Sequence, residues 1–217
     1  MTQRPSLDQP PEAFWEELYR PHRENPTLWG ARVNPLLGEV AAGLPPGVAL
    51  DLGSGAGGDA IWLARHGWRV TAVDISATAV AGLQRCAREQ ELAHLVTAER
   101  HDLARTFPEG AFDLVSAQYL HTPFALPRSA VLRAAAHALR PGGRLLVVDH
   151  GSRAPWSWDQ DPDARFPAPE EIHAELALAE PTWTVERSDA PRREATGPNG
   201  QTAVVTDHVL LLRRTPR

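Results

Sequence analysis

Short apolar runs alternate with amphipathic stretches along most of this chain. Between the runs, apolar residues recur at three- and four-residue spacing, which is typical of helices that pack one face on a sheet. This alternation predicts a mostly parallel sheet with helices on both faces. The expected strands span 48–52, 68–74, 94–100, 111–118 and 144–149, and the expected helices follow at 60–65, 76–87, 127–140 and 170–179.

The two ends of the chain depart from this alternation. Pro11 and Asn34-Pro35 are helix-start signals, so we expect residues 1–46 to form a helical cover. Residues 47–217 are then the α/β part of one structural domain. Near the other end, runs at 182–188 and 201–212 predict two antiparallel strands joined through the turn dipeptide Asn199-Gly200.

The first expected strand runs directly into a glycine-rich turn. The stretch Val48-Ala-Leu-Asp-Leu-Gly-Ser-Gly-Ala-Gly-Gly-Asp59 is followed by a helical pattern. Glycine tolerates positive φ and lets a bound molecule approach the backbone closely. Strand, glycine turn and helix together are typical of nucleotide-binding units. Asp74 ends the second strand about 20 residues later, where an acid can accept hydrogen bonds from ribose hydroxyls.

The acid Asp51 decides which nucleoside this turn favours. Gly53, Gly55 and Gly58 also fit the dinucleotide pattern G-x-G-x-x-G, so the glycines alone are weak evidence. A carboxylate two residues before the first glycine would repel a pyrophosphate and attract a cation. S-adenosylmethionine (SAM) carries a sulfonium and an ammonium and no phosphate. A tight turn without any ligand, or an NAD(P) site, are the alternatives.

Composition excludes several classes of protein. The chain has 217 residues and a net charge of −5, which gives no support for nucleic-acid or membrane partners. All 22 basic residues are arginine, and the single cysteine, Cys86, rules out an internal disulfide and a cysteine zinc cluster. No apolar run has the length of a membrane helix. We expect a cytoplasmic monomer or homodimer.

With these motifs in place, the chain resembles the class I SAM-dependent methyltransferases. Val48-Ala-Leu-Asp-Leu-Gly-Ser-Gly-Ala-Gly57 looks like their first motif, and the turn at 140–143 is a recurrent element before their fifth strand. The resemblance implies a Rossmann-like seven-stranded sheet with an antiparallel C-terminal pair. It also implies a set of cofactor contacts: Asp51, Gly53 and Gly55 near the methionine part, Asp74 at the ribose, and Asp102 and Leu103 at the adenine. Ser54, Ile75 and Gln118 are further expected cofactor contacts.

The N-terminal section is similar to the cover of tellurite-resistance and thiopurine methyltransferases. In such relatives an aromatic and a basic residue of the cover reach the methionine end of the cofactor. Trp29 and Arg32 are the candidates here, and Arg32 could pair with the cofactor carboxylate. The alternative is that Trp29 is a packing anchor and Arg32 a solvated charge.

The loops after the fourth and fifth strands hold the candidate catalytic groups. His121 is the candidate general base, and Tyr119 could orient a substrate through its hydroxyl. His150 and Trp156 are candidate substrate contacts, with Trp158 and Phe166 in the same loop. Either histidine could instead be an ordinary hydrogen-bonding residue of its loop. A metal bridged by His121, His150 and Asp149 has no supporting spacing motif, so no metal is expected.

The fourth strand also bears on the substrate. It ends in Gln118-Tyr-Leu-His121 and lacks the Asn/Asp-Pro-Pro-aromatic tetrapeptide of amino-directed methyltransferases. This absence lowers the expectation of a DNA or protein-glutamine substrate. The resemblance to the tellurite-resistance and thiopurine type implies transfer of a methyl group from SAM to a small thiol, hydroxyl or chalcogen-oxyanion acceptor. An NAD(P)-dependent oxidoreductase and a non-catalytic SAM-binding regulatory protein are the alternatives.

Overall fold

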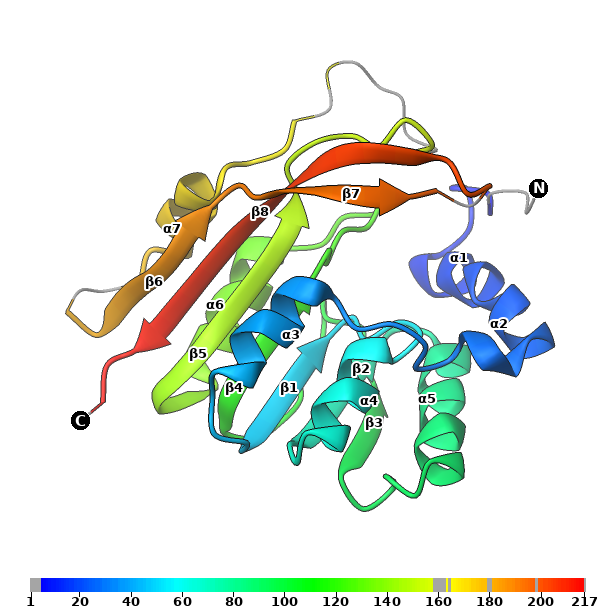
Figure 1. Cartoon of the computed structure of the whole chain (residues 1–217), viewed down its shortest axis with the longest axis horizontal. Coiled ribbons are helices and arrows are strands. Elements are labelled where there is room, and N and C mark those ends of the chain that lie inside the picture. The colour runs from blue at the N-terminus through cyan, green and yellow to red at the C-terminus, as the bar shows by residue number, and fades with distance from the viewer. Residues whose placement is uncertain (1–4, 158–162, 164, 179–180, 198, 217) are drawn as a thin grey trace.

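The computed structural model describes residues 5–157, 163, 165–178, 181–197 and 199–216. Its centre is a sheet in the order β3-β2-β1-β4-β5-β8-β6, and β7 pairs with the outer part of β8 (Figure 1). Strands β1 to β5 are parallel and β8 is antiparallel to β5, so the predicted fold class is confirmed. The strands are β1 Val48–Leu52, β2 Arg69–Asp74, β3 Val96–Arg100, β4 Phe112–Gln118, β5 Leu139–His150, β6 Trp183–Asp189, β7 Arg192–Thr196 and β8 Thr202–Arg214.

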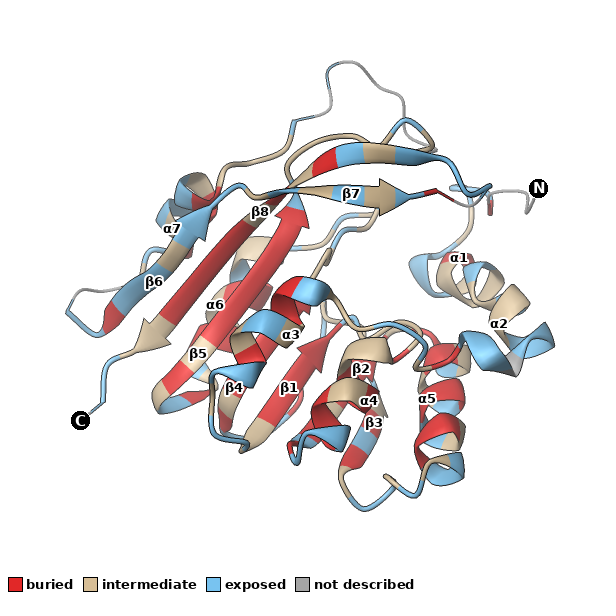
Figure 2. Cartoon of the chain, in the orientation of Figure 1, coloured by how far each residue is buried: buried red, intermediate tan, exposed pale blue. Residues whose placement is uncertain are grey.

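Helices cover both faces of the sheet. One face carries α3 (Pro35–Ala42), α4 (Gly58–Arg65) and α5 (Ala77–Glu89), and the other carries α6 (Arg128–His137) and α7 (Pro169–Leu176). Figure 2 shows that β1, β4, β5 and the inner half of β8 are buried between these layers. The near-continuous apolar runs of these strands are what a sheet covered on both faces requires.

Polar side chains begin two of these helices. The side chain of Asn34 accepts a hydrogen bond from the backbone N–H of Leu36, at the start of α3. Ser76 likewise accepts from Ala79 N–H at the start of α5. Both residues satisfy a backbone donor that the first helical turn leaves unpaired, so both helix starts agree with the sequence.

The N-terminal helices occupy two different places. Helix α3 packs on the face of the sheet beside α4, whereas α1 (Pro11–Leu18) and α2 (Arg20–Glu24) contact α5. Glu16 fixes α1 to the start of α5, because its carboxylate accepts from Ser76 Oγ and Thr78 N, each at 3.1 Å. These hydrogen bonds lower the pKa of Glu16 against the opposing effect of its burial. A short 3₁₀ turn, Pro26–Leu28, follows α2.

The C-terminal strands differ from the predicted simple hairpin. The turn that contains Asn199-Gly200 joins β8 to β7, not to β6. Strand β8 is long enough to pair with β6 along Val209–Arg214 and with β7 along Thr202–Thr206. Strand β7 was not predicted because its residues, Arg-Arg-Glu-Ala-Thr, lack the apolar alternation of a half-buried strand. Among the described helices, none is both long and apolar enough to cross a bilayer.

Candidate functional site

The glycine turn after β1 is held against the end of β2. Gly53, Gly55 and Gly57 have φ values of 70°, 53° and 77°, a left-handed region that favours glycine. The backbone N–H of Gly55 donates to Asp74 Oδ2 at 2.9 Å, and Ser76 N–H donates to the other oxygen of the same carboxylate at 2.9 Å. Asp74 therefore connects the glycine turn to the start of α5.

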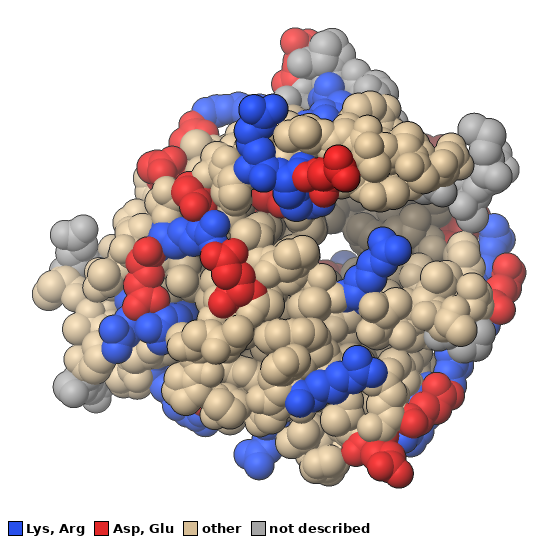
Figure 3. All heavy atoms as spheres, in the orientation of Figure 1, with Lys and Arg blue, Asp and Glu red and all other residues tan. Residues whose placement is uncertain are grey.

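Two hollows meet at this turn. The first, of about 400 Å³, lies beneath α1. Residues of α1, of the glycine turn and of the loops after β2, β3 and β4 form its wall, which includes Pro11, Trp15, Tyr19, Gly53, Asp74, Ile75, Asp102, Leu103, Gln118, Tyr119, Leu120, His121, Thr122, Phe124 and Leu126. The second, of about 340 Å³, lies between the turn and β7 and is lined by Arg32, Asn34, Asp51, Gly53, Ser54, Asp59, Gln118, Tyr119 and Arg193 among others. We call them the α1 hollow and the β7 hollow. Figure 3 shows an opening between the β7–β8 extension and the loop before α3.

Most of the predicted cofactor residues lie in these two hollows. Asp74, Ile75, Asp102 and Leu103 line the α1 hollow, and Arg32, Asp51 and Ser54 line the β7 hollow. Three residues, Gly53, Gln118 and Tyr119, line both. The structure thus brings together, along one path over the glycine turn, residues that are far apart in the sequence, such as Arg32 and Gln118.

Asp51 is a buried carboxylate without a full set of partners. Its side chain is 2% exposed, and its Oδ2 has no hydrogen-bond partner among the described residues. Burial raises its pKa well above the usual range, and the nearby Asp59 and Asp74 raise it further. Burial also raises the pKa of Asp59 to about 6, although a hydrogen bond from Asn34 N–H opposes it. A cation at this place would be stabilised by all three acids, which fits the ammonium and sulfonium of SAM.

The loop before α3 places Arg32 at the β7 hollow. Gly30 N–H donates to Ala56 O at 2.7 Å, which lays the loop along the glycine turn. A Cβ atom on Gly58 would lie 1.7 Å from the backbone oxygen of Arg32, so only glycine permits this approach. Asn34 then links the loop to the end of β4, because its amide donates to Gln118 Oε1 at 2.7 Å.

Trp29 lies in the core, outside both hollows. It is 4% exposed and packs where a Cβ atom on Gly82 of α5 would stand, 2.4 Å from the indole ring. Its Nε1 donates to His22 O at 2.9 Å. This position makes Trp29 a packing anchor between α5 and the loop. The aromatic residues that the N-terminal helices bring to the α1 hollow are Trp15 and Tyr19.

Tyr19 stands directly over the glycine turn. A Cβ atom added to Gly55 would lie 2.9 Å from the Tyr19 hydroxyl oxygen. Burial raises the pKa of Tyr19, and the charge of Asp74 raises it further, so the phenol is neutral at physiological pH. The sequence showed Tyr19 only as part of an apolar helical stripe.

The residues proposed for catalysis lie at the ends of β4 and β5. The ring of His150 stacks on Tyr119 with a centroid distance of 4.4 Å, and lies 5.8 Å from the ring of His121. His121 Nε2 is 3.2 Å from Asp149 Oδ1. The Tyr119 hydroxyl donates to Asp207 Oδ1 at 2.9 Å. Tyr119 and His121 line the α1 hollow, whereas His150 lies behind them.

The aromatic loop after β5 lies only partly within the described residues. Trp156 packs against Gly197, where an added Cβ atom would lie 2.6 Å from its ring, and it lines neither hollow. The Arg153 guanidinium lies over the Phe166 ring, with its carbon 6.0 Å from the ring centroid. Trp158, which the sequence grouped with them, lies outside the described residues.

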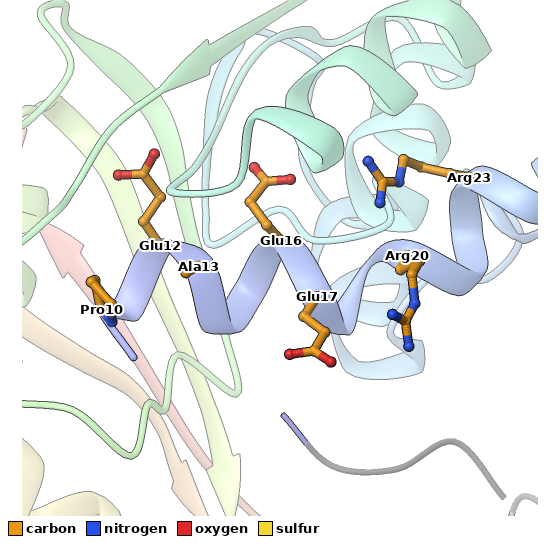
Figure 4. Close-up of a pocket in the computed structure, with 7 residues that line it drawn as sticks. All are labelled: Pro10, Glu12, Ala13, Glu16, Glu17, Arg20 and Arg23. Carbon is orange, nitrogen blue, oxygen red and sulfur yellow. The ribbon is translucent and has the colours of Figure 1, made fainter. Parts of the chain in front are cut away.

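A third hollow, of about 520 Å³, lies on the outer side of α1 and α2. Figure 4 shows its lining: Pro10, Glu12, Ala13, Glu16, Glu17, Arg20 and Arg23. No strand contributes to this wall, and its charges of both signs come from two consecutive helices. It is separate from the glycine turn. Within the part of the chain that the structure describes, no three acidic, histidine or cysteine side chains are grouped as a metal site.

Comparisons with known proteins agree with this geometry. Residues 50–147 match the family described as methyltransferase domain. A solved structure concerned with conversion of a disulfide bond into a thioacetal group during echinomycin biosynthesis has a TM-score of 0.69 and 26% identity, over 94% of this chain and 93% of its own. TehB from Haemophilus influenzae has a TM-score of 0.63 and 16% identity, over 93% of this chain and 67% of its own.

Two further similarities differ in extent. Magnesium protoporphyrin IX methyltransferase from Synechocystis PCC 6803, solved with bound S-adenosylhomocysteine (SAH), has a TM-score of 0.64 and 19% identity, over 94% of this chain and 98% of its own. The ribosomal RNA small subunit methyltransferase C of Alcanivorax borkumensis is 60% identical over 35 residues. That match spans 16% of this chain and only 11% of the relative.

The fold, the glycine turn with its acids and the matched domain define the class of the protein. The chain carries a class I SAM-dependent methyltransferase domain, and its cofactor is SAM. The predicted enzyme class and cofactor are thereby confirmed, and the NAD(P) alternative is not favoured. At 16% identity, the similarity to TehB shows the fold alone, so the tellurite-resistance and thiopurine subtype stays a prediction.

Proposed function

We propose that this protein transfers the methyl group of SAM to oxygen or sulfur of a small, largely apolar molecule. The observation that carries the proposal is the meeting of the two hollows at Gly53, Gln118 and Tyr119. An elongated cofactor with an adenosyl end and an amino-acid end fits such a path. The reacting centre would then lie near the end of β4.

The residues of the α1 hollow suit the adenosine part. Asp74 would accept hydrogen bonds from the ribose with Ile75 beside it, while Asp102 and Leu103 would hold the adenine. The residues of the β7 hollow suit the methionine part. There Asp51 would face the ammonium, Arg32 would pair with the carboxylate, and Ser54 with Gln118 would complete the wall.

The wall around His121 suits an apolar acceptor. Leu120, Phe124 and Leu126 follow the end of β4 in the α1 hollow, and Trp15 faces it from α1. Phe14, buried next to Trp15, stacks edge-on against Phe124 at 5.3 Å, which joins α1 to this loop. Aromatic and aliphatic walls with few polar groups are typical of small-molecule sites. The similarity to the ribosomal RNA enzyme covers a short segment, so it gives no support for a nucleic-acid acceptor.

Methyl transfer from a sulfonium is an in-line displacement that depends mainly on alignment. Positioning alone can supply roughly 7–11 kcal/mol of the barrier in model systems. Bound SAM supplies the electrophilic methyl group. In this proposal His121 accepts a proton from the acceptor, Tyr119 shapes the wall beside the reacting centre, and His150 supports both rings. Trp156, which packs against Gly197, would affect the acceptor only indirectly.

The first experiment is calorimetric binding of SAM, SAH and NADH to the purified protein. We expect binding of SAM and SAH and none of NADH. A panel of apolar thiols and phenols, scored by released SAH, then tests the transfer, and selenite in the same assay tests the chalcogen-oxyanion alternative. Binding of SAM with no SAH release from any acceptor would favour the non-catalytic regulatory alternative.

A further inference from the structure

Two buried carboxylates lie on neighbouring strands at the acceptor end of the sheet, with their side chains on opposite faces. Asp149 ends β5 and Asp207 lies in β8, and each is 1% exposed. In the antiparallel pairing of these strands His150 is opposite Asp207, which places both acids at the same edge. Each acid binds one arginine and one side chain of the loop after β4. The two sets are Arg128–Asp149–His121 and Arg193–Asp207–Tyr119.

In the first set, Asp149 is fixed from two directions. Arg128 Nη2 donates to both of its oxygens, at 2.7 and 2.5 Å, and Arg128 Nε donates to Leu120 O at 3.1 Å. The arginine thus holds the carboxylate and the β4–α6 loop at once. Burial alone would raise the pKa of Asp149, but the hydrogen bond from His121 and the charge of Arg128 outweigh it and lower that pKa. Asp149 therefore stays ionised.

An ionised Asp149 determines which nitrogen of His121 carries the proton. Because Oδ1 lies 3.2 Å from Nε2, the neutral ring keeps its proton on Nε2. Nδ1 then carries a lone pair and has no partner among the described residues. The same loop is held by the backbone, since His121 N–H donates to Tyr119 O at 2.7 Å. The imidazole thus lines the α1 hollow in one tautomer and one position.

In the second set, the Tyr119 hydroxyl already has a hydrogen-bond acceptor and a hydrogen-bond donor. It donates to Asp207 and accepts from Arg193 Nη2 at 3.1 Å. Burial, with the charge of Asp207, raises the pKa of Tyr119 to about 12. His150 stacks on Tyr119, and its pKa is lowered by burial and then by the neighbouring His121. Around His121, Asp149 contacts Nε2 and is held by Arg128, Asp207 and Arg193 bind Tyr119, and the ring of His150 is 5.8 Å away. Among the described residues, no side chain hydrogen-bonds to Nδ1.

We propose that Asp149, held by Arg128, is a positioning residue that makes His121 the general base, and that the acceptor therefore bears a dissociable O–H or S–H proton. This inference rests on the proposed methyl transfer. As a lone pair of the acceptor oxygen or sulfur forms the new bond to the methyl carbon, the carbon–sulfur bond of the sulfonium breaks and its electron pair stays on sulfur, giving SAH. The acceptor proton passes to His121 Nδ1 and from there to water.

The test compares two thiols that differ in acidity and share an apolar ring. Benzyl mercaptan keeps its proton near neutral pH, whereas thiophenol is largely ionised and needs no base. We expect the wild-type protein to methylate both. Asp149→Asn and His121→Gln should each lower kcat for benzyl mercaptan by roughly 100-fold or more, the scale of general-base catalysis, while changing the rate with thiophenol less than tenfold. The matched control is Asp207→Asn, whose effect should be equal for the two thiols.

A second measurement is independent of the acceptor. In ¹⁵N-correlated spectra of the imidazole nitrogens, His121 should be the Nε2–H tautomer in the wild-type protein and a mixture in Asp149→Asn. Calorimetric SAM affinity should be the same in both, which separates this inference from the proposed function. The inference is overturned by an equal effect of Asp149→Asn on both thiols, by an unchanged tautomer, or by a SAM-bound wild-type protein that methylates thiophenol but not benzyl mercaptan.

Discussion

Replacing Asp51 by asparagine should change cofactor binding and protein stability in opposite directions. The variant keeps the shape of the side chain and removes its charge. In the free protein this charge is buried with one oxygen unpartnered and with Asp59 and Asp74 nearby. We therefore expect Asp51→Asn to be more stable than the wild type at pH 7 and to bind SAM more weakly.

The expected sizes follow from the environment of the carboxylate. Asparagine keeps a polar atom in the place of Oδ2, so the gain comes from removing the buried charge and its repulsion by Asp59 and Asp74. The unfolding free energy should rise by about 1 kcal/mol or more. The bound ammonium would lose a charge-assisted hydrogen bond, which contributes about 1.5–3 kcal/mol. That range corresponds to a roughly 10- to 150-fold rise in the Kd for SAM.

The pH dependence of protein stability and of SAM affinity provides a second test of the buried acids. A raised carboxylate pKa means that the folded protein holds the proton to a higher pH than the unfolded chain does. The contribution of Asp51 and Asp59 to stability is therefore greatest below pH 4 and falls as pH rises through about 6, the pKa of Asp59. A cation displaces these protons, so SAM affinity should rise between pH 5 and 7, and less steeply in Asp51→Asn.

The assays are thermal or urea unfolding of the free proteins and calorimetry with SAM in two buffers of different ionisation enthalpy. Proton release on binding makes the observed heat depend on the buffer. An Asp51→Asn protein that binds SAM with wild-type affinity would refute the placement of the ammonium. A variant that is less stable than the wild type would refute the account of the buried acids.

Three further variants test the cofactor path. Asp74→Ala should weaken SAM binding by about 1–3 kcal/mol in calorimetry, and unchanged affinity would mean that the ribose lies elsewhere. Arg32→Gln should raise the Kd for SAM roughly tenfold and leave that of 5′-methylthioadenosine, which has no carboxylate, unchanged; equal losses for both would contradict the pairing. Gly58→Ala should displace the loop of Arg32, because its Cβ would overlap a backbone oxygen, and should lower the unfolding midpoint in urea. Gly43→Ala is the surface comparison, because Gly43 is exposed, has a φ of −85° and has room for a Cβ atom.

The sequence predicted those parts of the fold that depend on local patterns. The strand–glycine–helix unit, the acid at the end of β2 and the caps Asn34 and Ser76 are local signals, and the structure contains all of them. Parallel strands then bring their ends to one edge whatever lies between them. This is why Asp74, and Asp102, which was assigned through the family resemblance, line one hollow.

The rest depends on contacts between distant segments. Nothing near Asp149 in sequence indicates that Arg128 binds it, and the pair of Arg193 with Asp207 requires a strand, β7, that has no apolar signature. The interpretation of Trp29 depended on whether its indole faces the ligand or the core. The indole faces the core, because Gly82, more than 50 residues away in the sequence, has no side chain and leaves room for the ring.

The length of β8 has a consequence for how such a protein can change over evolution. Its second half, Val209–Arg214, is fixed between β5 and β6, while its first half, Thr202–Thr206, forms a strand pair with β7. Among the described residues of this β7 arm, Arg193 alone lines the β7 hollow. Insertions, deletions or exchanges elsewhere in the arm can therefore accumulate without loosening the central sheet or the glycine turn, and without changing the wall proposed for the methyl donor.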